Sequence, residues 1–318
     1  MKGYLPLENL PLWIGFVFAI AVLLAIDLGV FQRNAHTLSL REAALWTLTW
    51  VGLAMLFAVG VFQHLGKDAG IEFLSGYLIE YSLSVDNVFL FAVLFRYFQV
   101  PAPYQKRVLY WGILSAVAMR GIMIAAGAQL IERFSWVNYA FGGFLLYTGY
   151  RMFTQRGKEP DPGNSPLMRF LRTRLRLVDR YEEQKFWIRQ EGKRYATRLL
   201  LVLLLIEVTD VLFALDSIPA IFGITKNTFI VFTSNILAIL GLRSLYFLLA
   251  GVMDMFHYLT VGLSCILAFV GTKMILESAD WLEIPPLASL GIILGVLAVS
   301  IVASLLKQRQ ETLKLKKE

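Results

Sequence analysis

Cysteine and histidine are scarce in this sequence of 318 residues, and the shortage excludes several kinds of site. The single cysteine, Cys265, rules out an internal disulfide, a CxxC thiol couple and a cysteine-based metal cage. We expect it to be a buried, small apolar residue. His36, His64 and His257 lie at the ends of apolar segments without HxxxH spacing, which argues against an imidazole zinc site. A metal site in this chain would therefore have to use oxygen ligands.

Charged residues are also few, at 17% of the chain, whereas hydrophobic residues make up 57% and the mean hydropathy is +0.62. This composition is typical of a membrane protein. The net charge of +7 could suit nucleic acid, but the basic residues gather in particular loops, as membrane topology requires. We therefore expect membrane lipids, and no nucleic acid, among the partners. The N-terminal stretch has no small-x-small cleavage site and is interpreted as a retained first span.

Nine segments contain about 20 mostly apolar residues, the length that a spanning helix needs. They are residues 12–31, 43–62, 71–95, 108–130, 135–153, 199–222, 228–250, 257–276 and 286–306. Alternate connectors differ in charge: one set is rich in Lys and Arg, and the other is poor in them and includes the acidic stretch 277–283. The positive-inside rule then predicts an outside N-terminus, nine crossings and a cytoplasmic C-terminus.

The longest connector, residues 154–198, contains twelve Lys and Arg residues. It begins with a Pro/Gly-rich stretch that disfavours helix. Leu167, Leu171, Leu175 and Val178 then recur at helical spacing between arginines. A helix on the anionic inner leaflet and a solvated basic loop both fit this pattern. In either case the fold is expected to be an all-α polytopic membrane protein.

An internal repeat is visible when residues 79–89 are aligned with residues 209–219 and the match is continued downstream. The superposed charged pairs are Glu80 with Asp210, Asp86 with Asp216, Arg120 with Arg243, and Arg151 with Lys273. Each unit covers three spans, so the second unit must enter the membrane from the opposite side. The sequence thus predicts an inverted 3+3 helix repeat, the arrangement that places transport sites near the bilayer midplane.

Five parts follow from the spans and the repeat. They are two N-terminal transmembrane helices (1–70), the first three-helix repeat (71–153), the basic cytoplasmic linker (154–198), the second three-helix repeat (199–276), and the last transmembrane helix with a basic cytoplasmic tail (277–318).

Six carboxylates lie in the predicted spans. They are Asp27, Glu80, Asp86, Glu207, Asp210 and Asp216. Each costs about 2.5–3.5 kcal/mol at bilayer depth, or on the order of 15 kcal/mol in all. Arg120 and Arg243 can neutralise only two of them, so the others must be protonated, hydrated or matched by a bound cation. For Asp27, outside the repeat, a local cap or ion pair is an equally good interpretation.

The acids and amides near the predicted midplane form a hard-oxygen ligand set suited to Mn²⁺, Mg²⁺ or Ca²⁺. The candidate metal ligands are Glu80, Asp86, Asn87, Glu207, Asp210, Asp216 and Asn235. A pure proton relay and structural pairing remain alternatives, and Glu207 could be a ligand or a proton carrier because the first repeat has no counterpart. Pro219 predicts an unwound or kinked turn at residues 215–219, whereas the first repeat could break at residues 84–87 or stay helical.

The motifs "GYLIEYSLSVDNVFLF" (76–91), "LIEVTDVLFALDSIPAIF" (205–222) and "FTSNILAILGLRSLYFLLAG" (232–251) resemble those of the TerC family of integral membrane proteins. The resemblance implies a place in the bacterial cytoplasmic (inner) membrane and Mn²⁺ efflux, with acidic site residues at the matching positions. It also carries an older label of tellurite resistance and redox modulation. The sequence contains no thiol couple, haem motif or flavin motif that would support that label.

The sequence and the resemblance together predict a Mn²⁺ exporter that works by alternating access, with protons replacing the metal on the carboxylates. The metal is a transported substrate, and no resident cofactor is expected. The alternatives are a Ca²⁺ or Mg²⁺ carrier and a non-transporting membrane scaffold or redox-stress protein of the tellurite-resistance type. An enzyme is not expected, because no nucleophile–base pair or phosphate-binding glycine loop is visible.

Overall fold

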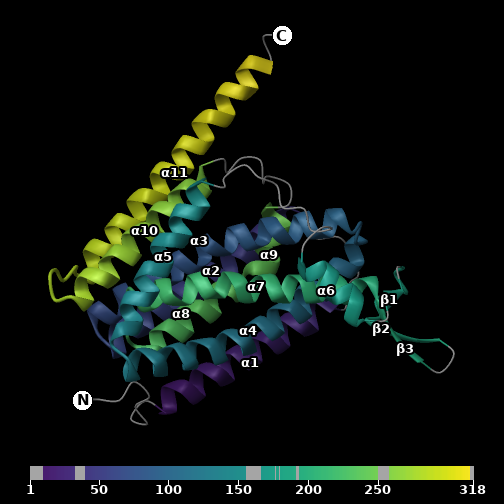
Figure 1. Ribbon diagram of the computed structural model, residues 1–318, viewed down its shortest axis with the longest axis horizontal. Coiled ribbons are helices and arrows are strands. Elements are labelled where there is room, and N and C mark those ends of the chain that lie inside the picture. Colours follow the sequence, from purple (N-terminus) through teal and green to yellow (C-terminus); the bar gives the residue numbers. More distant parts are fainter. Residues whose placement is uncertain are drawn as a thin grey trace.

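The structure is a computed structural model that describes residues 10–32, 40–154, 166–175, 177–178, 180–190, 193–249 and 258–315. Long apolar runs form the helices (Figure 1). These are α1 (Leu10–Gln32), α2 (Leu40–His64), α3 (Lys67–Tyr97), α4 (Ala102–Arg133), α5 (Trp136–Thr154), α6 (Pro166–Arg174), α7 (Arg198–Phe222), α8 (Thr228–Leu240), α9 (Leu242–Leu249), α10 (Leu259–Ser278) and α11 (Pro286–Leu315). The strands are β1 (Leu177–Val178), β2 (Trp187–Gln190) and β3 (Lys193–Thr197).

All nine predicted segments coincide with helices, the seventh being divided between α8 and α9. Within the described residues, six helices are long and apolar enough to cross a membrane: α2, α3, α4, α8 continued by α9, α10 and α11. The helix α7 has 25 residues but carries three carboxylates, which lower its apolar character. A polytopic, mainly helical membrane protein is therefore confirmed, whereas nine crossings stay a prediction.

The linker also contains strands, which neither of the two interpretations of its sequence, a surface helix or a basic loop, includes. Its three strands form a small sheet in the order β1-β3-β2, with β3 antiparallel to β2 and parallel to β1. Aromatic and β-branched residues such as Trp187, Ile188 and Tyr195 favour these strands. The helix α6 ends at Arg174 and buries Met168 in the core beside α7, so it packs on the protein itself.

Helix α7 continues through Pro219, so the predicted unwound turn at residues 215–219 is wrong, whereas a kink there stays a prediction. The proline lies in the last turn of the helix. The helix ends at Phe222, and the Gly223 amide that follows donates to the Pro219 carbonyl at 2.9 Å. Only the carbonyl of Leu215 loses its usual helical donor, a modest local loss. Helix α3 likewise stays helical through residues 84–87.

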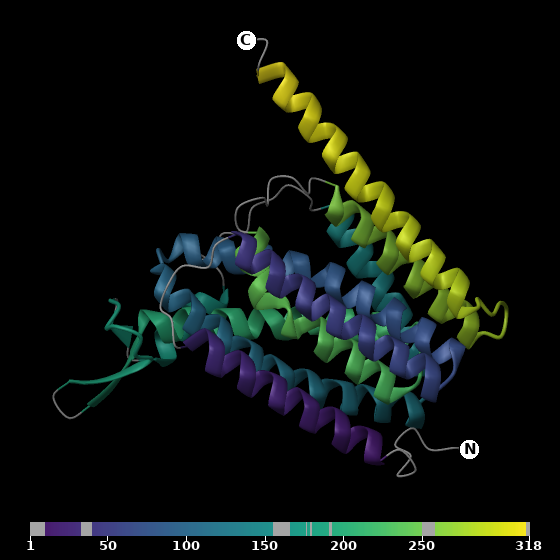
Figure 2. The same cartoon turned by 180° about the vertical axis from the view of Figure 1, so that it is seen from behind.

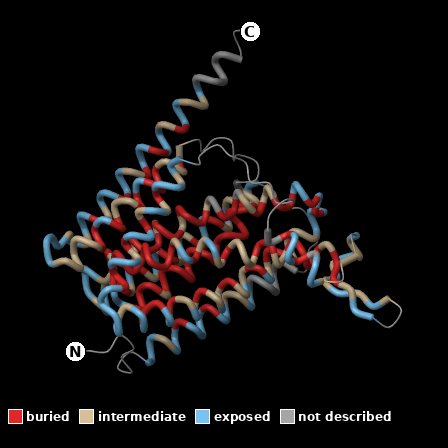
Figure 3. The backbone as a smooth tube through the Cα atoms, in the orientation of Figure 1, coloured by how far each residue is buried: buried red, intermediate tan, exposed pale blue. Residues whose placement is uncertain are grey.

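The buried residues concentrate in α3, α7 and α8, which run through the middle of the molecule (Figure 3). Seen from behind, α1 (dark purple) and α2 (blue-violet) lie on the outer side of this core (Figure 2). The helix α11 leans away and extends past the other helices (Figure 1). Cys265 is exposed on α10, so its predicted burial is wrong. In a membrane the outer surface is also apolar, and a small apolar residue does not need to face inward.

Helices that are equivalent in the predicted repeat pack against each other in opposite directions. On α5 and α10, Gly142 lies against Gly271, and Gly149 lies against Ser264, so the two helices are antiparallel. Glycine permits this approach, since a Cβ on Gly149 would lie 2.9 Å from the Ser264 carbonyl oxygen. Near the start of α3, Gly76 lies against Ile221 at the end of α7. The inverted repeat itself stays a prediction, and these directions are the ones that it requires.

Candidate functional site

Arg120, in the middle of α4, is completely buried and joins two acidic helices. Its guanidinium donates to Asp210 of α7 through two bonds, from Nε to Oδ2 at 3.1 Å and from Nη2 to Oδ1 at 2.9 Å. Its Nη1 forms an ion pair with Oε1 of Glu80 on α3. Two carboxylates, one from each predicted repeat unit, therefore share one arginine.

Amide and hydroxyl groups complete this buried network. The Asn235 side chain on α8 donates from Nδ2 to Oε2 of Glu80 at 2.8 Å and accepts from Arg120 Nη1 at 3.3 Å. Ser84, one helical turn after Glu80, donates to the same carboxylate at 3.4 Å. Four helices thus contribute polar groups to one buried point in the molecule, which we call the Arg120 network: Glu80, Ser84, Arg120, Asp210 and Asn235.

The Arg120 network has an excess of negative charge. With both acids ionised, two carboxylates and one guanidinium leave a net charge of −1. Burying charges in this way is costly unless they are paired and hydrogen-bonded, and here every carboxylate oxygen of Glu80 and Asp210 has a donor. The arrangement is an oxygen-rich, anionic centre in which Arg120 is the cation.

Glu207 lies one turn before Asp210 on α7 and makes a separate contact. Its Oε1 accepts a hydrogen bond from Ser115 of α4, and Gly112 lies next to the same oxygen. The absence of a side chain at Gly112 leaves the carboxylate room beside α4. Glu207 is half-buried, unlike Asp210, which is 3% exposed.

Asp216 lies farther along α7 and faces α5, where Thr148 donates to its Oδ1 at 3.0 Å. The side chains of Asp86 and Asp27 lie outside the described ones. Asn87 is 1% exposed, and its Oδ1 has no hydrogen-bond partner among the described groups. The same is true of the Ser217 hydroxyl, which the predicted repeat places at the position equivalent to Asn87. Two buried oxygens at equivalent positions are thus available to a ligand.

Of the seven predicted metal ligands, the structure brings Glu80, Asp210 and Asn235 into one network around Arg120. It places Glu207 and Asp216 in separate contacts with α4 and α5. Among the described residues, no three His, Cys, Asp or Glu side chains are close enough to hold a metal ion. Their role as ligands therefore stays a prediction.

Sequence reasoning missed a second polar cluster, where α3, α7 and α10 come together. The Lys273 ammonium group, 4% exposed, donates to the Gly223 carbonyl at 2.8 Å and forms an ion pair with Glu277 at 3.1 Å. Nearby on the chain, Thr225 donates to Glu72 of α3 at 2.5 Å. Two signals in the sequence point to Lys273: it lies inside an apolar run, as Arg120 does, and the predicted repeat pairs it with Arg151.

The sequence of these helices matches that of a known family of membrane proteins. The profile of the integral membrane protein TerC family matches residues 65–312, most of the chain. The chain belongs to the TerC family. The matched region includes α3 to α10, and with them every member of the Arg120 network.

Relatives of this TerC protein match almost end to end. One is a Myxococcus xanthus protein called "Uncharacterized membrane protein STKORF319", 52% identical over 298 residues that cover 94% of this chain and 93% of that one. Another is the Escherichia coli K12 protein called "Putative membrane-bound redox modulator Alx", 47% identical over 300 residues that cover 92% and 93% of the two chains. A membrane protein of Rickettsia bellii is 38% identical, with 93% and 97% covered. No solved structure matches the chain.

Proposed function

We propose that this TerC protein exports Mn²⁺ across the bacterial cytoplasmic membrane, with the Arg120 network as part of the transport site. The observation that carries the proposal is the convergence of Glu80 and Asp210, from equivalent positions of the two predicted repeat units, on Arg120. A purely structural ion pair needs one acid for one base. Burying a second acid costs free energy, and a pathway for cations would account for its presence.

Arg120 takes the place of the transported cation when the site is empty. A divalent ion added beside Glu80, Asp210 and Arg120 would change the net charge from −1 to +1. At about 4 Å and an effective dielectric constant near 20, the repulsion between Arg120 and the ion would be about 8 kcal/mol. The metal and the guanidinium would compete for the same carboxylate oxygens, and this repulsion favours a bound state in which Arg120 has left them.

The other carboxylate and amide oxygens can bind the metal at further points along the pathway. Glu207 and Asp216 lie on the same helix as Asp210 and accept hydrogen bonds from the hydroxyl groups of Ser115 and Thr148, which exchange partners at low cost. Asn87 offers a buried oxygen without a partner among the described groups. Protons and metal ions compete for carboxylates, so proton exchange is the proposed coupling.

The antiparallel packing of α3 on α7 and of α5 on α10 supports alternating access, in which one repeat unit moves against the other. The oxygen-only ligand set favours Mn²⁺, Mg²⁺ or Ca²⁺ over copper or zinc. We choose Mn²⁺ because of the resemblance to the TerC family. The protein is proposed to act without a resident cofactor and without enzymatic chemistry.

The test is metal transport by the purified chain in liposomes, followed with a metal-sensitive dye on the trans side. Glu80→Gln and Asp210→Asn are expected to abolish Mn²⁺ movement, whereas Glu132→Gln, an exposed acid on α4, is expected to leave it unchanged. If the protein moved calcium or magnesium but not manganese, the transported substrate would be one of those ions instead of Mn²⁺. Unchanged flux in both site variants would contradict the proposed site.

Direction is tested in cells. Cellular manganese under manganese challenge is expected to rise when the protein is absent and to stay high when only the Asp210→Asn variant is present. A cell that contains equal manganese with and without the protein would contradict export.

A further inference from the structure

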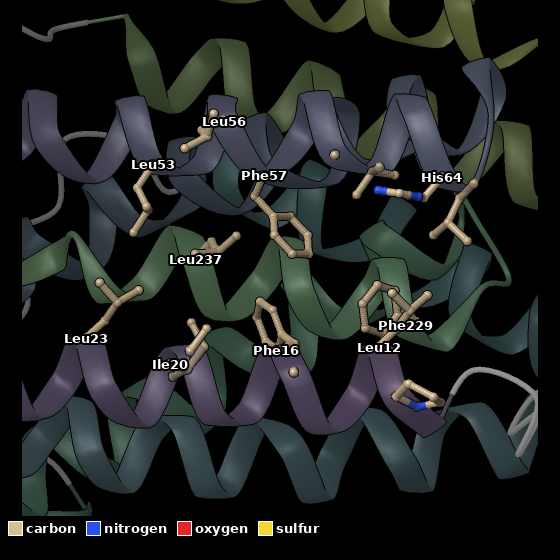
Figure 4. Close-up of a pocket in the computed structure, with 16 residues that line it drawn as sticks. Leu12, Phe16, Ile20, Leu23, Leu53, Leu56, Phe57, His64, Phe229 and Leu237 are labelled. Carbon is tan, nitrogen blue, oxygen red and sulfur yellow. The ribbon is translucent and has the colours of Figure 1, made fainter.

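An apolar groove separates α1 from α2 on the outer side of the molecule (Figure 4). Its volume is about 430 Å³, and its base is formed by Phe229 and Leu237 of α8. Phe16 and Phe57 project toward each other from the two walls. The walls also carry Gly15 and Gly60, and a Cβ added at either glycine would have no heavy atom within 4 Å, so the space beside them is open.

The groove has the length of one membrane leaflet. Its walls extend from Leu12 to Leu23 on α1 and from His64 to Leu53 on α2, and the two helices run in opposite directions. Eleven steps of about 1.5 Å make each wall about 17 Å long. Half of a hydrocarbon core of about 30 Å is about 15 Å. A lipid acyl chain that enters the groove at the His64 end would therefore finish near the bilayer midplane.

The volume of the groove also fits one acyl chain of a lipid. If a methylene group takes up about as much space as a water molecule in the liquid, roughly 30 Å³, the groove holds on the order of 14 methylene groups. This is about the size of one acyl chain.

Polarity is confined to one end of the groove. His64 is the only polar side chain among the described residues that line it, and it lies at the last residue of α2, where the exposed Lys67 follows at the start of α3. An imidazole and an ammonium group at a helix end suit a phosphate at the membrane surface. The rest of the lining offers only apolar contact.

An occupant would also complete the attachment of α1. The helix is fixed near its beginning by aromatic contacts, with Trp13 centred 5.2 Å from Phe229 and Phe16 centred 5.3 Å from Phe57. Leu23 and Leu53 face each other across the open part of the groove farther along. Beyond the contact of Phe16 with Phe57 the facing walls lack dispersion contacts with each other, and lipid chains are the apolar material that a bilayer supplies.

We propose that this groove is a binding site for one acyl chain of a membrane phospholipid, with the lipid phosphate beside His64 and the chain end between Leu23 and Leu53. The site is separate from the Arg120 network and does not depend on metal transport. It fastens α1 to the transport core through a lipid.

The test uses the full-length chain in nanodiscs of phosphatidylcholine and phosphatidylglycerol that contain a trace of phospholipid with a diazirine at the end of one acyl chain. After illumination, labelled residues are mapped by peptide mass spectrometry. We expect labels to concentrate around Leu23 and Leu53. If these residues and lipid-facing positions on α11, such as Val299, were labelled to the same extent, the proposal would be overturned.

Filling the groove provides the matched comparison. The double variant Gly15→Leu and Gly60→Leu is expected to lower labelling near Leu23 several-fold, whereas Gly52→Leu, at an open glycine of α2 outside the groove, is expected to leave it unchanged. Leucine has a higher helix propensity than glycine, so these variants should fold. Unchanged labelling in the double variant, or cross-links between two copies of the chain through the groove, would overturn the proposal.

Discussion

Replacing Arg120 with methionine removes the only guanidinium of the Arg120 network and keeps most of the side-chain volume. Glu80 and Asp210 then stay buried, with Asn235 and Ser84 donating to Glu80 alone. Removing one partner from a buried charge network destabilises a protein by about 3–5 kcal/mol, because the remaining charge has no compensation. Here two carboxylates depend on the same partner, so the upper part of this range is expected.

The loss can be expressed as a melting temperature. An unfolding entropy of about 2.1 cal/mol/K per residue gives roughly 0.7 kcal/mol/K for the whole chain, so Arg120→Met should melt about 6–8 °C lower. The assay is thermal unfolding of the purified full-length protein in detergent, followed by tryptophan fluorescence. Arg133→Met, at an exposed position of the same helix, is the matched control and should melt as the unaltered protein does.

A second variant separates uncompensated charge from lost packing. The triple change Arg120→Met, Glu80→Gln and Asp210→Asn carries no charge at the site, so it should melt above the single variant. If the triple variant melts lower than Arg120→Met, or if Arg120→Met melts within about 1 °C of the unaltered protein, the reasoning about the shared arginine is refuted.

Three further outcomes are expected. Gly149→Leu places a side chain 2.9 Å from the Ser264 carbonyl oxygen, so α5 and α10 must separate; the yield of folded protein in size-exclusion chromatography should fall sharply, and a normal yield would contradict the close packing. Lys273→Met removes the donor to the Gly223 carbonyl and should lower stability in the same melting assay by about 1–3 kcal/mol, whereas an unchanged melting temperature would show that this contact contributes nothing. Cys265→Ser should leave manganese flux in liposomes unchanged, because the proposed site uses only oxygen ligands, and a loss of flux would favour thiol chemistry.

The positions of the helices could be predicted because twenty apolar residues in a row have few other solutions in a membrane. The linker strands could not, since β1 to β3 contain two to five residues each and their arginines resemble those of a basic loop. The expectation that Cys265 is buried rests on rules for soluble proteins, which do not apply where the surface faces lipid. Pro219 is a weaker helix breaker than its sequence context suggests, because its effect depends on its distance from the helix end.

The candidate site is predictable in its chemistry and less so in its geometry. Buried acids at matching positions of two repeats point to Glu80 and Asp210, and the cost of burying them points to Arg120 as a counter-charge. That both acids share this arginine depends on how α3, α4 and α7 meet. The hydroxyl partners of Glu207 and Asp216, Ser115 and Thr148, are 92 and 68 residues away along the chain, and spacing within one segment carries no information about them.

The shared guanidinium makes the two halves chemically unequal. Arg120 belongs to the first unit, while its counterpart Arg243 is buried at the start of α9. A carrier built from interchangeable halves would rest equally well facing either side. In the proposed carrier, the only arginine of the network comes from one predicted unit, so we expect the inward-open and outward-open forms to differ in energy and the empty protein to favour one of them.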